Sequence, residues 1–144
     1  MSYLIDTCCV SELVKQKPEP NVITWFGQQD ERSLYLSVIT FGELKKGVVK
    51  LPDSKKKKNL NLWIKKDLNE RFKGRVLDIT IEVSDKWGEI LAKAEKKGQA
   101  LPAIDSLIAA TALVHGFSVV TRNTRDMRNS GVELINPWIS ESNT

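Results

Sequence analysis

The chain has 144 residues, of which 41% are hydrophobic and 28% are charged, a balance typical of a soluble globular protein with one sizeable core. No apolar run approaches the ~20 residues that span a membrane, and the N-terminus lacks a basic region followed by an apolar stretch, so we expect a cytoplasmic protein. The single histidine, His115, excludes a metalloprotease helix with two zinc-binding histidines and a nuclease that uses two histidines as acid and base. The adjacent Cys8 and Cys9 are too close in sequence to close a loop with a disulfide bond.

Strands and helices alternate along the chain. In chain order, we predict a strand over 2–7, a short helix over 10–14, a helix capped by Asn21, a strand over 34–38, a helix capped by Thr40, a long helix over 55–72, a strand over 76–79, a helix over 81–97, a helix over 103–114, a strand over 117–121, a polar loop or short helix over 122–130 and a strand over 132–135. This order predicts a three-layer α/β domain in which helices flank a mainly parallel central sheet of about five strands. We assign residues 1–139 to this single domain and expect a frayed tail over residues 140–144.

Local signals mark the ends of several helices. Thr40 followed three residues later by Glu43 forms a capping box, and Gly116 is placed to end the helix that contains His115. The tryptophans fall on apolar helix faces or in the closing segment, which favours core packing over stacking on nucleic-acid bases. They are Trp25, Trp63, Trp87 and Trp138.

Acidic residues stand where the predicted elements meet. Asp6 ends the first strand, and Glu43 lies one turn into the helix after the second. Because the carboxyl ends of parallel strands share one edge of a sheet, we expect both to gather there with Asn123, which follows the fourth strand. Asp105 joins them only if its helix begins at the same edge. Each acid also suits a structural role, as a helix cap or a first-turn charge, but Asp105 is the only charge between residues 101 and 114.

Clustered carboxylates with no histidine or thiolate beside them suit a hard cation such as Mg²⁺ or Mn²⁺. Such an ion lowers the pKa of a bound water and stabilises the charge on a phosphodiester. The acids therefore indicate a metal site for phosphoryl chemistry.

A basic region complements the acids. Residues 45–75 hold ten Lys and two Arg against three acids, a local charge of +9 within a chain of net charge +4. This separation suggests a polyanionic partner beside an acidic site. We predict contacts to the phosphates of such a partner from four successive residues, although a solvated helix face explains them equally well. They are Lys55, Lys56, Lys57 and Lys58.

Together, segments of the chain resemble the PIN-domain ribonucleases, and among them the VapC-type toxins of bacterial VapBC toxin–antitoxin pairs. The four ordered motifs are residues 4–7 (LIDT), 37–44 (SVITFGEL), 105–112 (DSLIAATA) and 120–127 (VTRNTRDM), and the ending is residues 136–138 (NPW). Four motifs in order are much more specific than any one of them.

The resemblance implies a Mg²⁺-dependent endoribonuclease toxin that cuts tRNA or rRNA and is neutralised by a VapB-like antitoxin. It also implies a homodimer within a larger toxin–antitoxin complex. Carried onto this chain, Asp6, Glu43 and Asp105 match the acidic positions that bind metal and carry catalysis. Asn123 stands where many members have Asp, so one metal ion or two are both compatible with the pattern, and Cys8 stands where the family usually has Asn.

Several polar residues near the acids are predicted to orient a ligand or a water, or to supply a fourth position. They are Thr7, Ser106, Thr121, Asn123 and Asp126. Ser106 equally suits a plain helix-start residue.

Two rival functions use the same residues differently. A catalytically degenerate PIN-type RNA-binding module, which Asn123 and Cys8 motivate, would bind RNA in a salt-sensitive way without metal-stimulated cleavage. A phosphohydrolase with an aspartyl nucleophile would use Asp6, but such sites usually have a second Asp two residues later, where this chain has Cys8.

Overall fold

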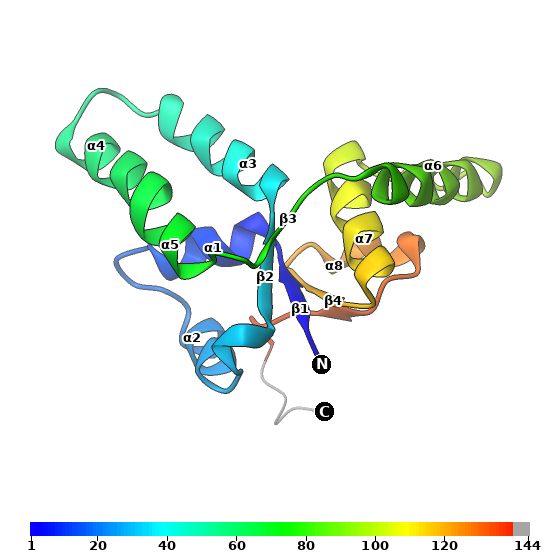
Figure 1. Ribbon diagram of the computed structural model, residues 1–144, viewed down its shortest axis with the longest axis horizontal. Helices are drawn as coiled ribbons and strands as arrows, with labels where there is room; N and C mark the ends of the chain where they lie inside the picture. Colours follow the sequence, from blue (N-terminus) through cyan, green and yellow to red (C-terminus); the bar gives the residue numbers. More distant parts are fainter. Residues whose placement is uncertain (140–144) are drawn as a thin grey trace.

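Five short strands form the centre of the molecule in the computed structural model, which describes residues 1–139 (Figure 1). They are β1 (Tyr3–Ile5), β2 (Leu34–Ser37), β3 (Val76–Leu77), β4 (Ser118–Val120) and β5 (Leu134–Ile135). All neighbouring strands pair in parallel, in the order β3-β2-β1-β4-β5. The predicted parallel sheet of about five strands is therefore confirmed, and the carboxyl ends of its strands share one edge.

Helical segments connect the strands. They are α1 (Thr7–Leu13), α2 (Pro20–Gly27), η1 (Glu31–Ser33), α3 (Val38–Val49), α4 (Lys55–Leu62), η2 (Trp63–Leu68), α5 (Asn69–Arg71), α6 (Ile81–Lys96), α7 (Ala103–His115), α8 (Thr124–Met127) and η3 (Arg128–Ser130). Within the described residues, no helix is both long and apolar enough to cross a membrane. The predicted tail over residues 140–144 lies outside the described residues.

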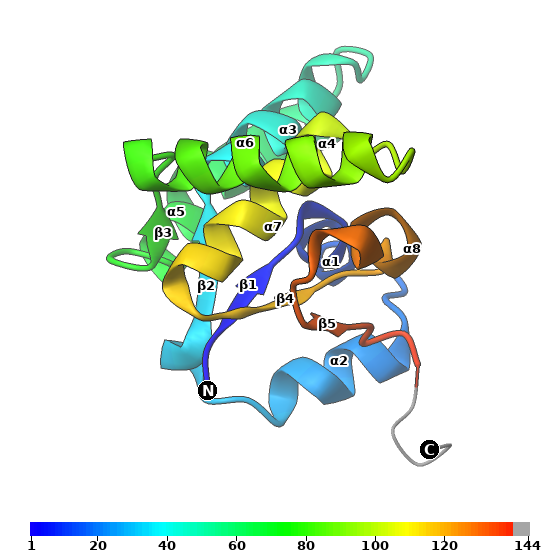
Figure 2. The same cartoon turned by 90° about the vertical axis from the view of Figure 1, so that its right-hand side faces the viewer.

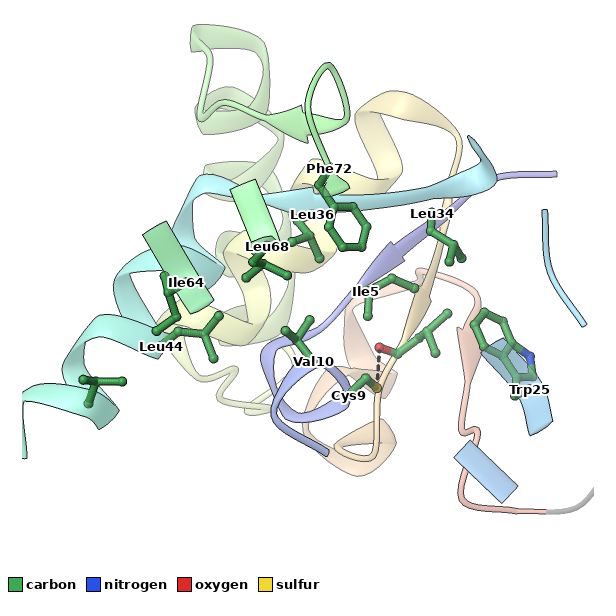
Figure 3. Packing of buried hydrophobic residues seen from close by; sticks show 12 residues of the cluster. Ile5, Cys9, Val10, Trp25, Leu34, Leu36, Leu44, Ile64, Leu68 and Phe72 are labelled. Carbon is green, nitrogen blue, oxygen red and sulfur yellow. Dashed lines mark hydrogen bonds between the residues drawn. The ribbon is translucent and has the colours of Figure 1, made fainter. Parts of the chain in front are cut away.

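Alternate strand residues face opposite helical layers, as the pleat of a strand requires. Ile5 and Val120 belong to a buried cluster that includes residues of α1, α2, α3 and η2. Leu4 and Val119 belong to a second cluster with residues of α7 and α8. Figure 3 shows the first cluster, in which the Cys9 thiol donates a hydrogen bond to the Val120 carbonyl at 3.3 Å. Cys9 is fully buried.

Two helical arms diverge from the edge where the strands end (Figure 1). One arm contains α3, α4 and α5. The other arm contains α6 and α7, and α6 crosses α7 (Figure 2). Since β1 and β2 run into the space between the arms, residues that follow these strands lie at the base of that space.

The long predicted helix over residues 55–72 contains a π-helical segment, η2, between α4 and α5. Leu60, Ile64, Leu68 and Phe72 recur every four residues, a spacing that would rotate by about 40° per step around a regular α-helix. A π-helical segment has more residues per turn, so it keeps Ile64, Leu68 and Phe72 buried on one side.

Two predicted helix caps are wrong. Ser37, not Thr40, caps α3, because its hydroxyl accepts a hydrogen bond from the Ile39 amide at 3.1 Å. Glu19, not Asn21, caps α2, because Pro20 fits the first helical position without needing a hydrogen bond. The Gly116 prediction is confirmed, since this residue ends α7 in the left-handed conformation with φ of 72°.

Candidate active site

Asp6 lies where β1 ends and is only 4% exposed. Its Oδ1 accepts a hydrogen bond from the Thr7 amide at 2.9 Å, so Asp6 caps α1, which begins three residues before the predicted start. Its Oδ2 accepts a hydrogen bond from the Thr121 hydroxyl at 2.7 Å. Asp6 therefore has the structural role that the sequence suggested and also presents a carboxylate at the shared edge of the sheet.

Thr121 follows β4 and is fully buried. Besides donating to Asp6, its hydroxyl accepts a hydrogen bond from the Asn123 amide at 2.9 Å. The Cys8 sulfur lies 3.7 Å from the same hydroxyl and 3.8 Å from Asp6 Oδ2. These contacts hold the ends of β1 and β4 together around one carboxylate.

Glu43 reaches the same region from α3. The Thr7 hydroxyl donates a hydrogen bond to Glu43 Oε1 at 2.6 Å, and the Thr40 hydroxyl oxygen lies 3.4 Å from the Thr7 hydroxyl oxygen. With Ser37 as the cap of α3, Glu43 does not close a capping box; its half-buried side chain turns toward α1 instead. Thr40, which the sequence suggested as a helix cap, is instead fully buried beside this contact.

Asp105 in the first turn of α7 completes the acidic group. Burial, together with the negative charges of Asp6, Asp126 and Glu43, raises its pKa to about 6. Burial also raises the pKa of Asp6, with Glu43 adding to the increase, although hydrogen bonds from Thr121 and Thr7 oppose it. Asp105 is therefore near enough to the other acids for their charges to interact.

The acids do not form a ready-made ligand cluster. Among residues 1–139, no three His, Cys, Asp or Glu side chains are grouped closely enough to hold a metal ion. The site instead presents separate carboxylate and hydroxyl oxygens, and within residues 1–139 no cation forms an ion pair with Asp6, Glu43 or Asp105. Oxygen donors with excess negative charge suit a hard divalent cation.

The fourth-motif residues sit at the rim of the site. Asn123 is exposed, and its amide rather than its side chain contacts Thr121. Asp126 lies on α8 and is also exposed. Its negative charge contributes to the raised pKa of Asp105.

Ser106 has partners away from the acids. Its hydroxyl donates to the Ala103 carbonyl and accepts a hydrogen bond from Trp87 Nε1, both at 2.9 Å. These bonds lock α6 onto the start of α7. The helix-start role that the sequence offered for Ser106 therefore describes its contacts better than a role in orienting the acids.

The four lysines lie at the start of α4, on the arm opposite α7 (Figure 1). Lys57 is half-buried and bonds to Asp53 and to the Val49 carbonyl, each at 3.3 Å. Its neighbours Lys55, Lys56 and Lys58 are exposed. Three of the four lysines predicted to contact phosphates are therefore accessible to a ligand from solvent.

A hollow beside the site was not foreseen from the sequence. Thr7 and Glu43 line it together with apolar residues of α3 and η2, including Leu44, Val48 and Trp63. Its lining residues come from three separated stretches of the chain, 7–14, 43–51 and 60–64, and no local pattern connects them.

The chain matches the family model described as PIN domain over residues 3–131. It is 37% identical to the plasmid stability protein StbB of Pseudomonas syringae, over 94% of this chain and 97% of that protein. It is 35% identical to the VapC ribonuclease Y4jK of Sinorhizobium fredii (94% and 96%) and 34% identical to the toxin FitB of Neisseria gonorrhoeae (94% and 97%). The crystal structure of FitAcB from Neisseria gonorrhoeae superposes with a TM-score of 0.91 at 33% identity, covering 96% of this chain and 99% of that one.

Proposed function

Because the chain belongs to the PIN-domain family, we propose that it is an endoribonuclease and the toxin of a type II toxin–antitoxin pair. Relatives named VapC ribonuclease and toxin FitB support this function, since the chain matches each over nearly its whole length. The observation that carries the proposal is the group of interacting acids at the carboxyl edge of the sheet, with Asp6 at its centre.

We assign the catalytic and metal-binding roles to Asp6, Glu43 and Asp105. Their oxygen donors and unbalanced charge fit Mg²⁺, and Mn²⁺ would suit the same donors. When bound, the ion supplies positive charge next to the phosphodiester and makes a nearby water more acidic.

Hydroxyl groups around the acids set the direction of two of the three carboxylates. Thr121 fixes Asp6 Oδ2, and Thr7 fixes Glu43 Oε1. Each bond restricts the rotation of its carboxylate, so less conformational entropy is lost when that carboxylate binds a ligand. Asn123 and Asp126 stand at the rim, where the exposed Asp126 carboxylate adds negative charge.

We propose that the exposed lysines of α4 contact the RNA backbone. Lys55, Lys56 and Lys58 lie on one of the two arms that flank the site. Phosphate contacts of this kind position a strand without reading its sequence. The target is therefore not defined by these lysines, and tRNA or rRNA is our proposed substrate class.

A protein antitoxin is the proposed partner, within an assembly that contains a homodimer of this chain. The similarity to FitAcB supports it, because the two chains share a fold over nearly their full lengths. We further propose that residues 1–139 act as one domain in the cytoplasm, where the substrate RNA is found.

RNA cleavage by purified protein tests the function. Wild type should cleave RNA with Mg²⁺ or Mn²⁺ and not with a chelator, whereas Asp6→Asn and Asp105→Asn should cleave only at background. Glu133→Gln is the control, because this exposed carboxylate lies before β5, at the opposite edge of the sheet. Full cleavage by both site variants would reject the assignment, and salt-sensitive RNA binding without any cleavage would favour the degenerate RNA-binding module.

A further inference from the structure

An arginine at the rim of the site is held in place by an aromatic platform. Arg122 follows Thr121 directly, and its Cζ atom lies 5.2 Å from the centre of the Trp138 ring. Its backbone amide donates to the Cys8 sulfur at 3.5 Å. The backbone of Arg122 is therefore part of the site, while its side chain extends over the indole.

Trp138 is a rigid support for this arginine. Its amide donates to Asn136 Oδ1, its carbonyl accepts a hydrogen bond from Asn21 Nδ2, and both distances are 2.9 Å. Its half-buried ring packs against the cluster that includes residues of α1 and α2. A guanidinium stacked on a fixed indole loses less conformational entropy when it forms a further bond.

The guanidinium remains open to solvent. Arg122 is exposed, and no ion pair between it and a carboxylate occurs among residues 1–139. Arg125, three residues further on, is exposed as well. The stacked face of Arg122 is covered by Trp138, but its edge can still donate two parallel hydrogen bonds to a phosphate.

The negative charge of the site repels a polyanionic strand, so a nearby cation would favour binding. Asp6, Glu43, Asp105 and Asp126 place negative charge where a polyanionic strand must approach. The α4 lysines lie on one side of β1, and α8, which follows Arg122, lies on the other (Figure 1). On the α8 side, the exposed Arg122 and Arg125 offer positive charge to a strand that crosses the acids, and Arg122 is the one whose side chain lies over Trp138.

We propose that Arg122, oriented by Trp138, binds a backbone phosphate of the RNA strand next to the acidic site. This inference rests on the proposed ribonuclease function and adds a substrate-binding residue on the α8 side. It assigns Arg122 to affinity and strand placement, not to base recognition, because a phosphate carries no sequence information.

RNA binding measured against salt concentration tests this role. The probe is a short fluorescent single-stranded RNA of mixed sequence, bound in chelator to Asp105→Asn protein so that cleavage does not interfere. Arg122→Met keeps an apolar stem over Trp138 but removes the charge. It should weaken binding roughly three- to tenfold and lower the slope of log K against log salt by about 0.7, the value for one phosphate contact to a single strand. Arg122→Lys should keep the slope.

Arg32→Met is the matched control, because Arg32 is an exposed arginine before β2, at the opposite edge of the sheet. It removes the same charge and should leave the slope unchanged. A slope for Arg122→Met equal to that of the control would overturn the proposal, as would weaker binding to a co-purifying antitoxin with RNA binding intact.

Cleavage by protein with Asp105 intact separates the two proposals. If wild type cleaves RNA and Arg122→Met keeps the full salt slope, the phosphate contact fails and the function stands. If wild type shows no cleavage while Arg122→Met lowers the slope, the function fails and the contact stands.

Discussion

The Thr121 hydroxyl donates a hydrogen bond to Asp6 Oδ2 at 2.7 Å and so joins the carboxyl ends of two neighbouring strands, β4 and β1. The same hydroxyl accepts the Asn123 amide, which leads into α8. One buried hydroxyl therefore ties the first motif of the chain to the fourth, 115 residues apart in sequence.

Replacing Thr121 should damage both the fold and the site. Thr121→Val has nearly the same shape but leaves a buried carboxylate oxygen and an amide without a partner, which costs about 1–3 kcal/mol. We expect urea unfolding to show this loss and Mn²⁺ calorimetry to show an affinity lowered about 10-fold or more. Thr121→Ser should restore both values toward wild type. Equal metal affinity in the valine and serine variants would show that the hydroxyl does not orient Asp6.

Cys8 is expected to support Asp6 in place of the family's usual Asn. Its thiol lies 3.8 Å from Asp6 Oδ2, and its sulfur accepts the Arg122 amide at 3.5 Å. Cys8→Asn should keep RNA cleavage within a few-fold of wild type, because an amide can donate and accept at the same two places. Cys8→Val can do neither and should cleave more slowly. The prediction fails if the valine variant cleaves as fast as wild type under single-turnover conditions.

Ser106 is expected to affect stability and not cleavage. Ser106→Ala removes the acceptor of the Trp87 Nε1 bond, so thermal unfolding should show a loss of about 1 kcal/mol. Trp87→Phe removes the donor of the same pair, and the double variant should lose less than the sum of the two single losses. A fall in the cleavage rate of folded Ser106→Ala protein would contradict this prediction and indicate that Ser106 assists the acidic site.

The acidic site should cost stability near neutral pH. The pKa of Asp105 is raised to about 6, so the folded state holds a proton that the unfolded chain has lost between pH 3.8 and about 6. Stability therefore falls as pH rises through this window and stays lower above it. The full shift corresponds to ~3 kcal/mol, which solvent screening of this half-buried group reduces to about 1 kcal/mol.

Asp105→Asn removes this cost and should be more stable than wild type at pH 7.5 by that amount, or about 2–4 °C in Tm. At pH 3.5 the two proteins should melt together, since both are then neutral at this position. Both measurements need a chelator. An equal difference in Tm at the two pH values would exclude titration of Asp105 as its source.

Much of the fold follows from patterns that act within a few residues. The alternation of apolar strands with helices, the left-handed Gly116 after α7 and the apolar stripe before Phe72 are all local, and the structure contains each of them. The caps of α2 and α3 were harder to predict, because Asn21 and Thr40, a few residues after the true caps, are equally suitable residue types. The choice between them depends on where the preceding segment packs.

The site was predictable only as a set of residues. The sequence placed Asp6 and Glu43 at one edge of the sheet through strand order, but it could not give the direction of α7 or bring Asp105 to that edge. Contacts made across the whole chain, such as Thr7 with Glu43 and Arg122 with Trp138, have no local signal at all. They arise from packing that joins distant segments.

The most direct test of the ribonuclease function is to sequence the RNA ends that appear in cells expressing this chain without an antitoxin. Wild type should generate new RNA ends at defined positions, and Asp105→Asn, produced at the same level, should generate none of them. The same set of ends from both proteins, or no new ends from either, would contradict the claim that this acidic site cleaves RNA.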